Sequence, residues 1–222
     1  EEYKRIGVKQ RELMMAFPLN SNGTADTENI RDIFAYLPVR NYGFRFIIHA
    51  DFLLSASRED IHKKGEWNEY LRDNIIPVFL EAVEEFKKDD NLKNTYYNYI
   101  PLKEEVNDAF FLTAVKEIYS RLKEKECILT EDHNWRKPSD ILYAEKEEKE
   151  LIPNKALNNI LNKEYLSSQA VIKKELLEIL NCERFGIKYL LDVLKNSDWL
   201  DKQSDDWFGR LYNYLAGIDI DK

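Results

Sequence analysis

The clearest alternation of hydrophobic and polar positions runs from Phe44 to Leu54. Every second residue of this segment is apolar, while Arg45, His49 and Asp51 fall between them. A period of two places neighbouring side chains on opposite faces of a strand, so the segment predicts a half-buried β-strand. Its expected core face consists of Phe44, Phe46, Ile48, Ala50, Phe52 and Leu54.

A helical pattern follows after a polar turn. Between Trp67 and Lys88 the apolar residues recur at steps of three and four, which is the spacing of one face of an α-helix. We expect this helix to pack on the sheet. We also expect Pro77 to kink it or to split it in two, because proline removes a helical hydrogen bond. The predicted apolar stripe consists of Trp67, Leu71, Ile75, Val78, Ala82 and Phe86.

Two more strand-like segments, residues 12–19 and 32–39, precede the strand at Phe44. The short turns between these segments favour an antiparallel sheet. Gly43 together with Asn41 is expected to form the hairpin turn. Residues 1–90 are therefore predicted to be an α+β region, a small antiparallel sheet with one packed helix.

After about residue 90 the pattern becomes mainly helical. Helices are predicted near residues 106–122, 157–161, 171–180, 185–194 and 207–215. Residues 127–142 instead predict a two-stranded hairpin that turns at Asp132-His133-Asn134 and ends at Pro138. We therefore expect residues 91–222 to be a mainly helical extension with one β-hairpin.

Composition narrows the classes of function. With 222 residues, of which 44% are hydrophobic, the chain is long enough for a sizeable core. The formal charge of −8 argues against a broad nucleic-acid surface. No apolar run approaches the length of a membrane span and the first residues lack a signal-peptide layout, so we expect no membrane contact and a cytoplasmic location. Cys127 and Cys182 are expected to be buried thiols.

The candidate chemistry lies at Ser57-Arg58-Glu59, where the strand gives way to the helix. A guanidinium is a planar fork of donors that stays charged, so it suits charge on phosphate oxygens. From the residues alone, an ion pair of Arg58 with Glu59, Asp60 or Asp51 at the strand end is the more ordinary interpretation.

Other chemistries find less support. The seven glycines never lie close together, so no phosphate-cradling loop is present in the sequence. The serines at 55 and 57 lack a nucleophile elbow. His62 and His133 have no second histidine at metal-ligand spacing, and we expect surface imidazoles. The chain alone is predicted not to bind or hydrolyse ATP.

Several motifs occur together between Ile33 and Leu71. They are Tyr36-Leu37-Pro38, Gly43 to Phe46, His49 to Leu54, Ser57 to Glu59, and Trp67-Asn68. In combination they resemble the segment that follows the ATP-binding domain in sacsin and its plant and bacterial relatives. The ATPase fold of that family is shared with the ninety-kilodalton heat-shock chaperone, gyrase and histidine kinases. Cys127 to Leu142 resembles a later hairpin of the same proteins, and together these stretches cover about a quarter of the chain.

The resemblance implies a fold like the second domain of ribosomal protein S5, as in the chaperone's middle domain. It also implies that Arg58 makes a catalytic contact with ATP held, with Mg, in an upstream domain of the same protein. Ser57 and His62 would accompany it at the nucleotide. The chain departs from the chaperone pattern at Ile61-His62, where the chaperone has leucine and glutamine.

Two functions follow as expectations. In the first, the chain is a non-catalytic coupling segment of a larger chaperone-like or defence-type ATPase, whose partners are the upstream ATP-binding domain and possible protein clients. In the alternative, the chain is a protein-interaction scaffold module with no role in nucleotide hydrolysis.

Overall fold

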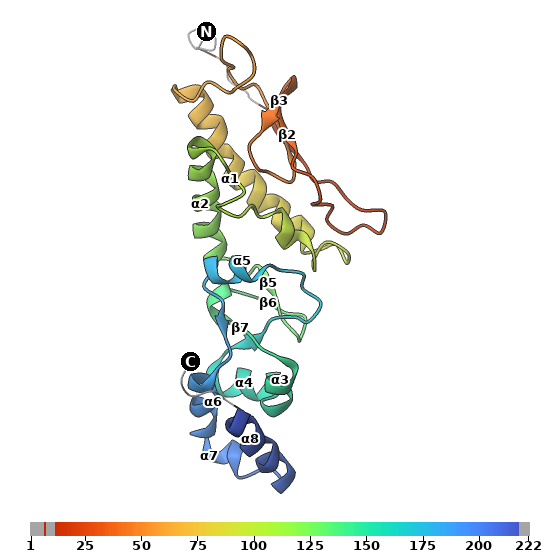
Figure 1. The fold of residues 1–222 in the computed structure, drawn as a ribbon, viewed down its shortest axis with the longest axis vertical. Helices are drawn as coiled ribbons and strands as arrows, with labels where there is room; N and C mark the ends of the chain where they lie inside the picture. The colour runs from red at the N-terminus through yellow and green to blue at the C-terminus, as the bar shows by residue number, and fades with distance from the viewer. Residues whose placement is uncertain (1–6, 8–11, 218–222) are drawn as a thin grey trace.

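The structure, a computed structural model, describes residue 7 and residues 12–217. These residues form an elongated molecule with a sheet at one end, two long helices beside it and a group of short helices at the other end (Figure 1). The predicted α+β class is confirmed.

The N-terminal sheet has four strands: β1 (Leu13–Ala16), β2 (Asp32–Ala35), β3 (Leu37–Asn41) and β4 (Ile47–Ala50). Their order is β1-β4-β2-β3. Two pairings are antiparallel, but β2 and β4 run parallel, so the prediction of a wholly antiparallel sheet is wrong. The reason is a reversal at Tyr36, whose φ is 66°, inside the segment that we expected to be one strand.

The predicted core face of the Phe44 strand is confirmed over most of its length. Its side chains from Phe44 to Phe52 are at most 3% exposed, while Leu54 is only partly buried. The hydrogen-bonded strand β4 is shorter than the alternation. The pattern therefore reports burial, not the extent of strand pairing, since Arg45 and Phe46 lie in a bend before β4.

Gly43 does not make the hairpin turn that we predicted, because the turn lies at Tyr36. Its φ is +99°, and a Cβ atom there would lie 1.9 Å from the backbone oxygen of Glu105. Gly43 is needed for this close approach of two backbone segments.

Helix α1 (Glu66–Phe86) continues past Pro77, so the helix is not split. Pro77 lies on its exposed side. The fully buried stripe includes Leu71, Ile75, Phe79 and Val83, at steps of four. The prediction of Val78 and Ala82 was wrong in phase: both are only partly buried.

The middle of the chain agrees with the predicted pattern. A short 3-10 helix, η2 (Tyr96–Tyr99), leads to helix α2 (Ala109–Lys123), which packs on α1. The hairpin of β5 (Ile128–Leu129) and β6 (Trp135–Arg136) turns through His133 as predicted, and η3 (Pro138–Asp140) follows it. The apolar stripe of α2 is buried as expected.

The far end contains a parallel sheet that the sequence did not predict. Its order is β8-β7-β9, formed by β7 (Ile141–Tyr143), β8 (Glu164–Tyr165) and β9 (Glu183–Arg184). Strands of two or three residues are too short to show alternation. The surrounding helices are α3 (Lys146–Leu151), α4 (Asn154–Leu161), α5 (Lys174–Ile179), α6 (Ile187–Leu194), α7 (Ser197–Leu200) and α8 (Asp205–Gly217).

Two apolar cores fill the molecule. The main core contains residues on both sides of the predicted boundary near residue 90, and Phe44 meets Phe111 across it with ring centroids 5.6 Å apart. The second core lies between residues 142 and 211. Strand β7 borders both, because Ile141 belongs to the main core and Leu142 to the second.

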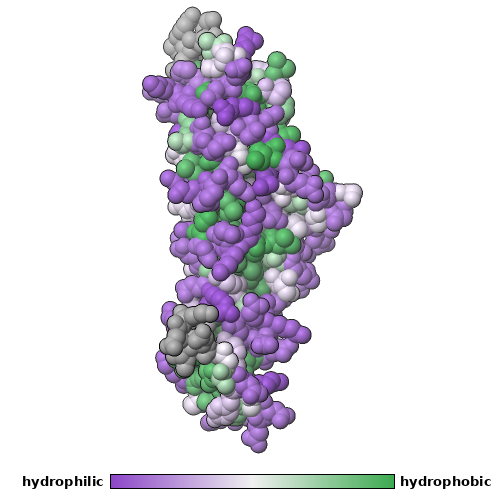
Figure 2. All heavy atoms as spheres, in the orientation of Figure 1, coloured by the Kyte–Doolittle hydropathy of each residue, from purple (hydrophilic) through white to green (hydrophobic). Residues whose placement is uncertain are grey.

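The surface seen in Figure 2 is largely hydrophilic, with small separate groups of hydrophobic residues. Among the described residues, no helix combines the length and the apolar character needed to span a bilayer. Cys127 and Cys182 are buried free thiols, as predicted.

We predict that Gly43→Ala lowers the free energy of unfolding by at least about 2 kcal/mol, because it adds left-handed strain to a clash with backbone. Urea denaturation measures the change. The control is Gly209→Ala in α8, where a Cβ atom meets nothing within 4 Å. Alanine there is expected to be neutral or stabilising. Equal effects of the two substitutions would contradict the close approach at Gly43.

Candidate functional site

The Ser-Arg-Glu motif lies at the tip of a closed loop, residues 55–60, which we call the Arg58 loop. Leu54 and Ile61 form an antiparallel bridge at its base. Within it, the Ser55 amide donates to the Asp60 carbonyl at 2.8 Å and the Arg58 amide donates to the Ser55 carbonyl at 2.9 Å. Arg58 thus lies in a loop between strand β4 and helix α1, and α1 begins at Glu66, close to the predicted start near Trp67.

Arg58 is exposed and its φ is 61°. Within residues 12–217 its side chain makes no ion pair or hydrogen bond, so the expected pairing with Glu59, Asp60 or Asp51 is not formed there. The guanidinium donors are therefore available to a ligand.

A groove of about 900 Å³ separates the Arg58 loop from the β2–β3 hairpin. The hairpin contributes Tyr36, Leu37 and Pro38, and the segment after β4 contributes Arg58 and His62. Both His62 and Arg58 are exposed. The structure thus brings two of the three predicted site residues to one groove.

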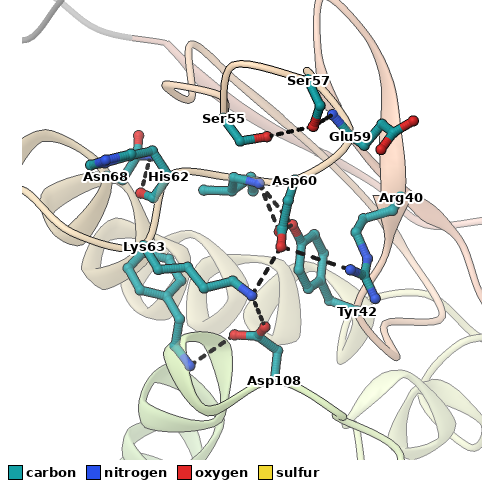
Figure 3. A network of polar contacts seen from close by, with 12 residues as sticks. Arg40, Tyr42, Ser55, Ser57, Glu59, Asp60, His62, Lys63, Asn68 and Asp108 are labelled. Carbon is teal, nitrogen blue, oxygen red and sulfur yellow. Dashed lines mark hydrogen bonds and ion pairs between the residues drawn. The ribbon is translucent and has the colours of Figure 1, made fainter.

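Ser57, the third predicted residue, uses its hydroxyl group within the loop (Figure 3). Its Oγ lies 3.2 Å from the Ser55 Oγ and accepts from the Glu59 amide at 3.4 Å. This places Ser57 among the contacts that shape the loop, with an exposed side chain beside Arg58.

The base of the loop is held by Asn68, which is 1% exposed. Its Oδ1 accepts from the Leu53 amide at 2.9 Å, and its Nδ2 donates to the carbonyls of Leu53 at 2.8 Å and His62 at 2.7 Å. Trp67 adds a bond from Nε1 to the Asp51 carbonyl at 2.8 Å. The Trp-Asn pair at the start of α1 therefore fixes both ends of the loop, a role that the sequence analysis missed.

One side of the loop is held by the carboxylate of Asp60 (Figure 3). Tyr42 donates its hydroxyl to Asp60 Oδ1 at 2.5 Å. Lys63 Nζ lies 3.1 Å from Asp60 Oδ2 and 2.6 Å from Asp108 Oδ2. Arg40 completes the cluster at 3.8 Å from Asp60.

These contacts shift the pKa values of Asp60, Lys63 and Tyr42. Partial burial raises the pKa of Asp60, but the hydrogen bonds from Tyr42 and Lys63 outweigh it, so the pKa lies below its ordinary value. The hydrogen bond to Asp108 raises the pKa of Lys63. Burial, followed by the bond to Asp60, raises the pKa of Tyr42. At neutral pH, Asp60 is therefore ionised, Lys63 is protonated and Tyr42 keeps its hydroxyl proton.

Taken together, the groove offers a free guanidinium and an exposed imidazole on a fixed loop, an arrangement that suits an anion. Within the part of the chain that the structure describes, no three His, Cys, Asp or Glu side chains are grouped as a metal site. His133 is exposed at the β5–β6 turn, away from the groove lining.

Comparison with known proteins gives one informative relative. Protein NO VEIN of Arabidopsis thaliana is 31% identical to this chain over 205 residues. The match covers 86% of the chain but only 8% of that protein, so the chain spans a small part of its relative's length. No protein-family model matches the chain. No solved structure matches it either.

We predict that Asn68→Ala lowers the free energy of unfolding by roughly 2 to 4 kcal/mol, because it leaves buried backbone groups without partners. The matched control is Asn74→Ala on the same helix, whose amide bonds only the Tyr70 carbonyl one turn earlier. That change is expected to stay within about 0.5 kcal/mol. If urea denaturation shows similar losses for both variants, Asn68 does not hold the loop.

The lowered pKa of Asp60 predicts a pH-dependent difference between the parent chain and Asp60→Asn. The stability contributed by the carboxylate is complete above its unfolded pKa of about 3.9 and is lost as the pH falls through the lower folded value. We expect a difference of about 1 kcal/mol at pH 7, modest because the pair is partly screened by solvent. Urea denaturation from pH 7 to pH 2 should show that the difference in unfolding free energy between the two proteins becomes smaller in acid. A difference that stays constant would contradict the lowered pKa of Asp60.

Proposed function

We propose that this chain is a non-catalytic coupling segment of a larger ATP-dependent protein of the sacsin-like, chaperone-like class. In this proposal Arg58 contacts the terminal phosphate of ATP that another domain holds with Mg. The observation that carries it is the state of Arg58: exposed, without an ion pair among the described residues, and facing a groove from a fixed loop.

The physical argument concerns preorganisation. A guanidinium stabilises a phosphoryl-transfer transition state only if it is held near the position where charge builds up. The Asn68 bonds and the Asp60 cluster fix the backbone on either side of Arg58, so less ordering remains for the moment of contact. His62 lines the same groove and is the proposed second polar contact.

Other observations support a segment of a longer protein. The motif resemblance implies a position after an ATP-binding domain, and the match covers only 8% of the relative NO VEIN, which is therefore far longer than this chain. We further propose that β1–β4 with α1 form a unit like the second domain of ribosomal protein S5. The two buried free thiols fit the reducing cytoplasm, which we propose as its location.

A second function, a protein-interaction module, is favoured by the tip of the β2–β3 hairpin. Tyr36 and Leu37 are 76% and 71% exposed, which is high for adjacent large apolar side chains. In this alternative the groove faces a protein partner and Arg58 has no part in hydrolysis.

ATP turnover of the natural protein that includes the residues preceding this chain separates the two functions. Arg58→Ala is expected to lower kcat about a thousandfold, the size seen when an arginine that contacts the transferred phosphate is removed. Arg58→Lys is expected to restore only part of the rate, because lysine lacks the planar fork.

The control is Arg121→Ala on α2, an exposed arginine that pairs with Glu117 on its own helix. It should leave turnover unchanged. Unchanged turnover with Arg58→Ala as well would reject the coupling function and favour the interaction module.

A further inference from the structure

Lys63 is held by two carboxylates from distant parts of the chain (Figure 3). Its Nζ lies 3.1 Å from Asp60, which closes the Arg58 loop, and 2.6 Å from Asp108, which precedes α2. The lysine side chain is 40% exposed and Asp108 only 12%. Lys63 thus bridges the Arg58 loop and helix α2.

Asp108 has two roles at once. Its Oδ1 accepts from the Phe110 amide at 2.9 Å as the N-cap of α2, while its Oδ2 accepts from Lys63. An N-cap satisfies an amide that the helix itself leaves without a partner. The position of the lysine is therefore linked to the first turn of α2.

Asp60 is tied equally closely to the Arg58 loop. Its Oδ1 accepts from the Tyr42 hydroxyl at 2.5 Å and from the Ile61 amide at 2.8 Å, and its carbonyl accepts from the Ser55 amide at 2.8 Å. A continuous set of polar contacts thus leads from the loop through Lys63 to α2.

The ion pairs of Lys63 are weak enough to break and form again, because its side chain is partly exposed. A partly exposed ion pair contributes about 0.2 to 1 kcal/mol, whereas breaking a fully buried pair costs several times more. A coupling of this size changes an equilibrium by up to about fivefold, which is the lower edge of the ordinary range between two sites.

Helix α2 also leads away from the groove. It packs along α1 and its buried stripe ends in the main core near the β5–β6 hairpin. Figure 1 shows it running from the sheet end toward α5. Helix α2 therefore physically connects the groove end of the molecule with its middle.

We propose that Lys63 is a positioning residue that couples the Arg58 loop to helix α2 by bridging Asp60 and Asp108. This inference rests on the proposed function: Asp60 closes the loop that carries Arg58, so the bridge influences where Arg58 lies. The bridge itself does not depend on ATP.

Hydrogen exchange of the full 222-residue chain tests the bridge. Lys63→Met should make the loop amides of Ser55, Arg58 and Ile61 exchange up to about fivefold faster. The matched control is Lys64→Met, an exposed neighbouring lysine with no ion pair among the described residues. Equal acceleration by both variants would overturn the proposal.

Asp108→Ser separates coupling from local stability. Serine caps a helix about as well as aspartate but is too short and uncharged to hold Lys63. The first-turn amides of α2 should keep their exchange rates, while the Arg58 loop should exchange faster, as in Lys63→Met. A loop unaffected by Asp108→Ser would overturn the proposal, because a capping role alone predicts no effect at that distance.

ATP turnover of the longer protein tests whether the Lys63 bridge acts through Arg58. Lys63→Met is expected to lower kcat several-fold when Arg58 is present and to have no further effect in the Arg58→Ala background. If Arg58→Ala leaves turnover unchanged, the proposed function fails, and the exchange results still decide the bridge. If Lys63→Met lowers turnover equally in both backgrounds, the coupling to Arg58 is wrong.

Discussion

The site depends on the buried amide of Asn68. In the segment between β4 and α1, Phe52, Leu53 and Ile61 pack into the main core, but residues 56–59 at the loop tip are exposed, so packing alone does not fix the tip. The amide satisfies both main-chain groups of Leu53 and the carbonyl of His62 at once. Because buried backbone groups require partners, this side chain holds the two ends of the loop together, and the bridge of Leu54 with Ile61 and the Asp60 contacts complete the loop that carries Arg58.

The distribution of charge around the loop explains why Arg58 is free in an acidic chain. The carboxylates of Asp60 and Asp108 already have partners, chiefly Lys63 and Tyr42. The two proposals rest on this same arrangement: the Lys63 cation is paired with two carboxylates, and the Arg58 cation is left for a ligand. An acidic balance over the whole chain thus coexists with a local site for an anion.

Periodicity predicted the parts of the fold that bury one continuous face. The core face of the Phe44 strand and the stripe of α2 follow from it because each spans many residues. Sequence patterns did not predict the reversal at Tyr36 or the close approach of Gly43 to Glu105, because contacts between distant parts of the chain determine both. Arg58 was predicted from its motif. The bridge from Lys63 to Asp108 joins residues far apart in sequence, and no spacing rule reveals it.

Strand β7 places consecutive side chains in different cores, Ile141 in one and Leu142 in the other. Two domains joined by a flexible linker rotate independently, so a movement of one is not passed to the other. Here a bend at the junction must disturb packing on both sides of one short strand, which resists it. The two cores are therefore expected to move together as one elongated body and not as two independent units.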